Sequence, residues 1–171
     1  MKIETDINRI KTIAKQKTDE NWQFRAFLKN YDAPNERIDS IVHELYKEVL
    51  SFIDCKQCAN CCKEMRPTLK PDDIRVFSQR IGVSIAQLKK NYLIKDEDPE
   101  ESEKEYTFNQ SPCPFLERNV CSNYDCRPED CRSFPHLHKD EFVSRLFGVT
   151  DSYSVCPIVF NVYEQLKIRL W

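Results

Sequence analysis

The sequence predicts a mainly α-helical fold, with a single domain of helices around an irregular, cysteine-rich core. Apolar residues recur at spacings of three and four in several stretches, which is typical of amphipathic helices. Nine cysteines lie between positions 55 and 156, most of them beside Pro, Asn or Asp. A chain of 171 residues with 40% hydrophobic and 32% charged residues has the length and composition of a folded globular protein.

The first third of the chain predicts two long helical regions. Residues 3 to 31 carry apolar side chains at helical spacing, with Thr18-Asp19 as the candidate division between two helices. A helix over residues 35 to 53 follows the start signal Pro34-Asn35 and leads directly into Cys55. We interpret residues 1–54 as an N-terminal helical scaffold, with a partner-docking face as the alternative.

Two helix starts follow the first cysteines. Pro71, with acidic residues behind it, predicts a helix that ends near Gly82, because proline and negative charge both suit the first turn. Ser84 predicts the cap of a short helix that runs through Tyr92. Residues 95 to 106 form an acidic run, which we interpret as a solvated loop, because calcium binding would need a defined oxygen spacing and a turn glycine.

The remainder of the chain is irregular until its last helix. Residues 106 to 109 predict a short strand, and residues 128 to 131 predict one helical turn. A loop region as long as 113–135 usually needs another source of order, which metal ligation can supply. Pro157 begins the last helix, and we expect residues 158–171 to pack on the same domain as the cysteine region 55–157.

Charge and hydropathy exclude several classes of partner. A net charge of −2 offers no basic surface for nucleic acid. No stretch approaches the roughly 20 apolar residues that span a bilayer, and the N-terminus is not a secretory signal, so we expect a cytoplasmic protein without a membrane partner. A cysteine-dense cytoplasmic chain binds metal more often than it forms disulfides. A protein partner stays an open possibility.

The cysteine spacing indicates a soft-metal site. Thiolates favour zinc, copper(I) and iron–sulfur clusters. The run Cys55-x2-Cys58-x2-Cys61 is similar to the first three ligands of bacterial ferredoxins, although Met65 stands at the fourth position. Structural zinc usually shows two separated Cys-x2-Cys pairs, whereas the later cysteines here are spread out. An iron–sulfur cluster or other iron site is therefore favoured, with zinc as the alternative.

Other side chains near the later cysteines have two interpretations each. Arg127 and Arg132 flank Cys131, and either could donate hydrogen bonds to sulfur or hold an anionic substrate, or simply balance charge. Tyr124 is expected to pack on the site. His136 and His138 are interpreted as surface histidines, with completion of a Cys3His centre as the alternative.

A series of motifs over residues 55–157 resembles one known family. The first motif is Cys55-x2-Cys58-x2-Cys61-Cys62. It is followed along the chain by Cys113-Pro114-Phe115-Leu116, Cys121-x2-Tyr124, Arg127-Pro128, Cys131-Arg132-x-Phe134-Pro135 and Cys156-Pro157. In this order they resemble the YkgJ-type cysteine-cluster family, also described as zinc- or iron-chelating CxxCxxCC proteins. Ala59-Asn60 stand where relatives often have glycine, and residues 1–50 lie outside the resemblance.

The resemblance implies eight metal ligands and leaves Cys126 as the remaining thiol. These ligands are Cys55, Cys58, Cys61, Cys62, Cys113, Cys121, Cys131 and Cys156. Flagellin lysine N-methylases resemble the family in this region, but the chain lacks a glycine-rich strand-to-helix turn for their nucleotide, so that activity is not carried over.

We therefore expect a metal-binding protein that carries an iron–sulfur or iron centre, with a redox or protein-modifying role. Two alternatives stay open. One is a zinc-stabilised, non-enzymatic binding or adaptor module, and the other is a protein of metal storage or delivery. The sequence leaves open whether the protein is an enzyme.

Overall fold

The computed structural model describes residues 2–95 and 106–171. The chain divides into two compact units, each described here by itself. The first unit joins Met1–Cys55 to Pro135–Trp171, and the second is Lys56–Phe134. The division of the sequence into 1–54, 55–157 and 158–171 stays a prediction. Nearly all of the predicted acidic loop, at 96–105, lies outside the described residues.

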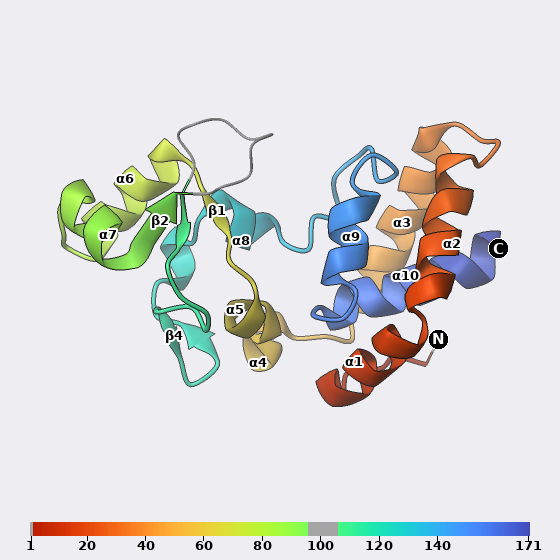
Figure 1. The fold of residues 1–171 in the computed structure, drawn as a ribbon, viewed down its shortest axis with the longest axis horizontal. Helices are drawn as coiled ribbons and strands as arrows, with labels where there is room; N and C mark the ends of the chain where they lie inside the picture. The colour runs from red at the N-terminus through yellow and green to blue at the C-terminus, as the bar shows by residue number, and fades with distance from the viewer. Residues whose placement is uncertain (1, 96–105) are drawn as a thin grey trace. The chain divides into compact units, whose positions relative to one another are not determined.

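The first unit is a group of helices, drawn in red, orange and blue in Figure 1. Its long helices are α1 (Ile7–Gln16), α2 (Thr18–Lys29), α3 (Asn35–Leu50) and α10 (Pro157–Leu170), with the shorter α9 (Leu146–Ser152). Helices α3 and α10 pack against each other along their apolar faces, where Val42, Leu45 and Val162 are almost fully buried. The prediction of a mainly α-helical fold is confirmed.

Local signals explain where several of these helices begin. The Asp6 carboxylate caps α1 by accepting hydrogen bonds from the backbone N–H groups of Asn8 and Arg9, at 2.9 and 3.2 Å. Helix α1 ends at Gln16, and the next residue, Lys17, has a non-helical backbone, so the division from α2 falls one residue before the predicted Thr18-Asp19. Pro157 occupies the first turn of α10, as predicted.

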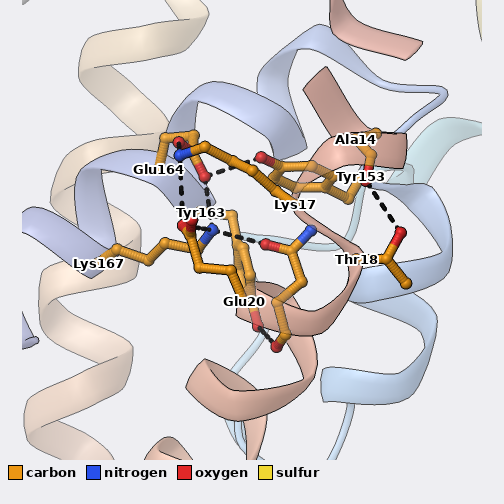
Figure 2. Close-up of polar contacts among 9 residues, drawn as sticks. Ala14, Lys17, Thr18, Glu20, Tyr153, Tyr163, Glu164 and Lys167 are labelled. Atoms are coloured by element: carbon orange, nitrogen blue, oxygen red, sulfur yellow. Dashed lines mark hydrogen bonds and ion pairs between the residues drawn. The ribbon is translucent and has the colours of Figure 1, made fainter. Parts of the chain in front are cut away.

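A partly buried network of charged side chains, with Lys167 at its buried centre, joins α2 to α10 in the first unit (Figure 2). The Lys167 side chain is only 7% exposed, and its ammonium group donates to Glu20 at 2.7 Å, Asn21 at 2.6 Å and Glu164 at 2.7 Å. Lys17 contacts the same two carboxylates, and the Tyr153 hydroxyl donates to Glu164 at 2.8 Å. Every charge in this network therefore has an opposite partner, which a buried ion pair requires.

The loop at residues 136–145 of the first unit is held by the Asp39 carboxylate and the Arg145 guanidinium. Asp39 of α3 is buried and accepts from the backbone N–H groups of Glu141 and Phe142, at 2.9 and 2.8 Å. Arg145 donates to the backbone carbonyl of His136 at 2.8 Å and to that of Lys139. The loop that carries the histidines is thus held by side-chain to backbone hydrogen bonds in place of regular structure.

The second unit packs two helices against a small antiparallel sheet. Helices α6 (Pro71–Arg80) and α7 (Ile85–Tyr92) lie with strands β1 (Thr68–Leu69), β2 (Leu93–Lys95) and β3 (Tyr106–Phe108), in the order β1-β3-β2. Leu69, Ile74, Phe77, Leu88, Leu93 and Phe108 form its apolar core. Ser84 caps α7 by accepting from the backbone N–H of Gln87 at 3.2 Å, as the sequence predicts.

Short elements make up the cysteine-bearing part of this unit. They are α4 (Cys55–Cys58), which begins at the boundary of the units, α5 (Asn60–Glu64), β4 (Leu116–Glu117), β5 (Val120–Cys121), the 3-10 turn η1 (Tyr124–Cys126) and α8 (Glu129–Ser133). The predicted strand near 106 and the helical turn near 128 correspond to β3 and α8. Among the described residues, no helix has both the length and the apolar character that crossing a membrane requires.

Candidate metal centre

The CxxCxxCC motif folds as two short helical turns separated by one left-handed residue. Helix α4 ends at Cys58, Ala59 has φ 49° and ψ 17°, and α5 then carries Cys61 and Cys62. A left-handed backbone costs a residue with a Cβ roughly 1–2 kcal/mol, which glycine avoids. Ala59 thus adopts a backbone conformation that favours glycine.

Two hydrogen bonds to backbone carbonyls bring Cys113 to the motif. The Cys113 N–H donates to the carbonyl of Cys62 at 2.8 Å. Two residues earlier, the Ser111 hydroxyl donates to the carbonyl of Lys63 at 2.7 Å. These two bonds join segments about fifty residues apart in the sequence, so the position of Cys113 next to α5 does not depend on its side chain.

A tight hairpin presents Cys121. Strands β4 and β5 pair in antiparallel register, with Leu116 opposite Cys121. The turn residues Arg118 and Asn119 both have positive φ, at 51° and 65°, as a two-residue hairpin turn with the twist of the strands requires.

Helix α8 presents Cys131 and is held at its start by two carboxylates. Asp73 of α6 accepts from the Glu129 N–H at 2.9 Å, and Asp130 accepts from the Thr68 N–H at 3.0 Å. The irregular region around residues 109–135 is therefore connected to α5, β1 and α6, and Cys131 is positioned relative to all three.

These segments enclose a cavity of about 80 Å³ within the second unit. Five cysteines line it, together with Arg66, Arg127, Asp130 and a largely apolar wall. The cysteines are Cys61, Cys62, Cys113, Cys121 and Cys131, and the apolar wall includes Met65, Phe77, Phe108, Phe115 and Phe134. None of the described residues that line the cavity is a histidine.

Four of these thiols influence one another's ionisation. A hydrogen bond from Cys61, together with the positive charges of Arg127 and Lys63, lowers the pKa of Cys62 to about 7, although burial opposes this. Burial, with the neighbouring Cys62 and Cys121, raises the pKa of Cys113 to about 11.

Burial also raises the pKa of Cys121, and it raises that of Cys131 strongly, with Cys62 contributing to both shifts. In the absence of a cation, one thiolate thus forms easily and disfavours ionisation of its neighbours.

The donor set fits a soft metal, although the side chains do not already converge on one point. Thiolates are the preferred protein ligands of zinc and of iron–sulfur clusters. A metal cation would offset both the burial and the mutual repulsion that keep three of the four thiols protonated. Across residues 2–95 and 106–171, no three His, Cys, Asp or Glu side chains already stand in the arrangement of a metal site.

A family comparison agrees with this donor set. Residues 54–147, more than half of the chain, match the CxxCxxCC family model, which is described as "Putative zinc- or iron-chelating domain". The chain belongs to the CxxCxxCC family. No match to it was found among curated proteins or among solved structures.

In this CxxCxxCC protein, the other expected ligands occupy different places. Cys55 and Cys156 belong to the first unit, where both influence Tyr46, whose pKa is raised by burial and by these two thiols. Cys156 is buried at the N-terminus of α10 and lies beyond the residues that match the family. Cys58 is half-buried at the end of α4.

Cys126, which the resemblance leaves out of the ligand set, does not line the cavity. Its Sγ donates to the carbonyl of Asn123 at 3.5 Å, and its side chain packs against the apolar core of the second unit. Cys121 therefore lines the cavity and Cys126, five residues away, does not, although Cys126 is close enough to contribute to the raised pKa of Cys121.

The two arginines beside Cys131 have different environments. Arg127 lines the cavity and lies over the Tyr124 ring, with its guanidinium carbon 3.7 Å from the ring centroid. Arg132 forms an exposed ion pair with Glu129 at 2.8 Å. His136 and His138 belong to the first unit, where the His138 ring centroid lies 6.3 Å from that of Tyr46.

Sequence reasoning did not identify the aromatic wall or Asp130 as parts of the site. Phe77 and Phe108 come from the core elements α6 and β3, and no local motif connects them with the cysteines. Asp130 stands beside Cys131, but its role in fixing α8 to β1 depends on a residue 62 positions away.

Proposed function

We propose that Cys62, Cys113, Cys121 and Cys131 bind one metal centre in the second unit, which accounts for the metal chelation of this family. The observation that carries the proposal is their common cavity, in which Cys62 influences the ionisation of each of the other three. Cys61 lines the same cavity and hydrogen-bonds Cys62, so it is the substitute ligand if one of the four does not bind.

The size of the cavity favours an inorganic guest over an organic substrate. Pockets for small organic ligands usually measure roughly 300–1,000 Å³, and this cavity measures about 80 Å³. It is lined mostly by sulfur and apolar side chains, with few groups that could orient a polar metabolite. A metal ion or small cluster suits both the volume and the donor atoms.

We favour an iron–sulfur or iron centre in this position, with a redox or protein-modifying role. One feature supports a cluster: Arg127 supplies a hydrogen-bond donor and a positive charge beside the cavity thiols. Hydrogen bonds to sulfur and local charge are among the factors that set cluster reduction potentials.

A zinc-stabilised binding module is the second candidate. It is supported by the irregular segments that bring Cys113, Cys121 and Cys131 together, since a structural zinc ion would hold such short elements in place. Under this proposal, replacing Cys131 lowers the stability of the second unit and removes no separate chemistry.

Metal storage or delivery is the third candidate. It predicts that a chelator removes the metal from the folded protein within minutes.

The other expected ligands, Cys55, Cys58 and Cys156, stay part of the proposal. Cys55 and Cys156 are neighbours of Tyr46 in the first unit, which supports a second group of thiolates there. Cys58 is retained because of its place in the CxxCxxCC spacing, where a Cys-x2-Cys step lets two sulfurs reach one metal centre.

Elemental analysis with an optical spectrum tests these candidates. The protein is purified without oxygen and without added metal, and iron, zinc and acid-labile sulfide are measured per chain. Iron with sulfide and a broad visible band supports the favoured proposal. Stoichiometric zinc without colour supports the second candidate. A wild-type protein that holds neither iron nor zinc after this purification contradicts all three candidates.

A further inference from the structure

Arg127 lines the cavity with Cys62 and Cys121, and its positive charge interacts favourably with the thiolate forms of both. Arg66 and Asp130 line the cavity as well, but the Arg66 side chain is exposed. Lys63 acts in the same sense on Cys62, but it does not line the cavity.

The Arg127 side chain is fixed by its neighbours. Its guanidinium carbon lies 3.7 Å from the centroid of the Tyr124 ring, a cation–π contact, and its Nε donates to the Tyr124 carbonyl at 3.0 Å. The backbone carbonyl of Arg127 accepts from Arg132 at 2.7 Å. Lys56 also lies over the Tyr124 ring, at 4.6 Å. The positive charge is therefore held in one place before any metal arrives.

A centre of four thiolates needs a fixed positive charge beside it. One divalent cation neutralises only half of the charge on four thiolates, and the excess is costly in a half-buried, largely apolar site unless it is compensated. Water supplies little compensation here, because the four thiols are half-buried and the cavity wall is mostly apolar. A fixed guanidinium at the wall supplies it without reorganisation.

We propose that Arg127 is a positioning residue that sets the metal affinity of the four-thiol centre by holding a positive charge beside Cys62 and Cys121. This inference rests on the proposed function. It distinguishes Arg127 from Arg132, which flanks Cys131 on the other side and pairs with Glu129 at the surface. The two arginines provide a matched comparison, because each substitution removes one positive charge from the same short segment.

Zinc affinity is the measurement, made at a fixed pH by competition with a chromogenic chelator. Arg127→Gln is expected to weaken zinc binding by about 10- to 100-fold, the usual effect of removing an outer partner of metal ligands. Arg132→Gln is expected to stay within about twofold of wild type, because its ion pair with Glu129 is exposed and its hydrogen bond reaches the Arg127 backbone carbonyl, not the guanidinium. Arg127→Lys retains the charge without the planar contact to Tyr124, so its affinity should lie between wild type and Arg127→Gln.

Three outcomes would overturn the inference. One is equal zinc affinity in Arg127→Gln and Arg132→Gln, which would mean that the position of the charge does not matter. Another is Arg127→Lys binding as weakly as Arg127→Gln, which would mean that the charge itself does not matter. The third is a loss of zinc affinity that the lowered thermal stability of metal-free Arg127→Gln fully explains, which would reduce Arg127 to a structural role.

The experiment also separates this inference from the proposal on which it rests. Cys131→Ser serves as the reference for a broken centre. If wild type binds zinc tightly, Cys131→Ser does not, and Arg127→Gln equals wild type, the inference alone fails. If wild type binds zinc no more tightly than Cys131→Ser, the four-thiol centre itself is refuted, and the inference falls with it.

Discussion

Metal binding to the four-thiol cavity should release about three and a half protons per divalent ion at pH 7, because thiols bind metal only as thiolates. The number follows from the ionisation of the metal-free site. Cys62 has a pKa of about 7 and is half ionised at that pH, so it releases half a proton. The pKa of Cys113 is about 11, and those of Cys121 and Cys131 are raised above the ordinary thiol value, so each releases one.

The sign of the pH dependence follows directly. Protons compete with the metal for sulfur, so affinity falls as the pH falls. At three to four protons per metal, zinc affinity should change by roughly a thousand- to ten-thousandfold for each pH unit between 6 and 8. A site with one thiolate and neutral or oxygen ligands would show a much weaker dependence.

Calorimetric titration with zinc, in two buffers of different ionisation enthalpy, measures the protons released. Cys131→Ser should release about one proton fewer, because the serine hydroxyl keeps its proton on binding. Cys126→Ser should match wild type, since Cys126 lies outside the cavity. Release of fewer than two protons by wild type would refute a site made of these four thiolates.

Three further predictions concern the choice of ligand cysteines and the stability of the first unit. Cys121→Ala should lose the bound metal while Cys126→Ala retains it, as metal analysis of the purified variants would show; equal loss from both would contradict the assignment of Cys126 as the remaining thiol. Lys167→Met should lower the free energy of unfolding in urea by roughly 3 kcal/mol, because it leaves the half-buried Glu164 with fewer opposite charges. A loss below about 1 kcal/mol would show that the network contributes little. Asp39→Ala should cost about 1–3 kcal/mol in the same assay because two backbone N–H groups lose their acceptor, and Asp39→Asn, which keeps an acceptor oxygen, should be milder.

Helix positions were predicted from the sequence where the cause is local. Ser84 and Pro157 act within a single helical turn, and the helices that they begin are present in the structure. Helix α9, at Leu146–Ser152, was not predicted. It contains Gly148 and β-branched residues that give weak helical signals, and it forms where it can pack against α10.

The site was predicted as a set of ligand types but not as an arrangement. The spacing of the CxxCxxCC motif indicates soft-metal ligation because thiolate chemistry is a property of the residue itself. Which cysteines share a cavity depends on pairings such as that of Cys113 with Cys62, which no local pattern encodes. Arg127 and Arg132 are equivalent neighbours of Cys131 in the sequence, and only the contacts with Tyr124 and Glu129 distinguish them.

X-ray absorption at the edge of the bound metal tests the central claim most directly, because it reports the ligand atoms themselves. For wild-type protein purified without oxygen, a centre in the four-thiol cavity predicts a first shell of sulfur, at about 2.3 Å for zinc, with an additional iron–iron shell if the metal is a cluster. In Cys131→Ser this sulfur shell should shrink or the metal should be absent. A first shell dominated by nitrogen or oxygen in the wild-type protein would contradict the assignment of the cavity cysteines as the metal ligands.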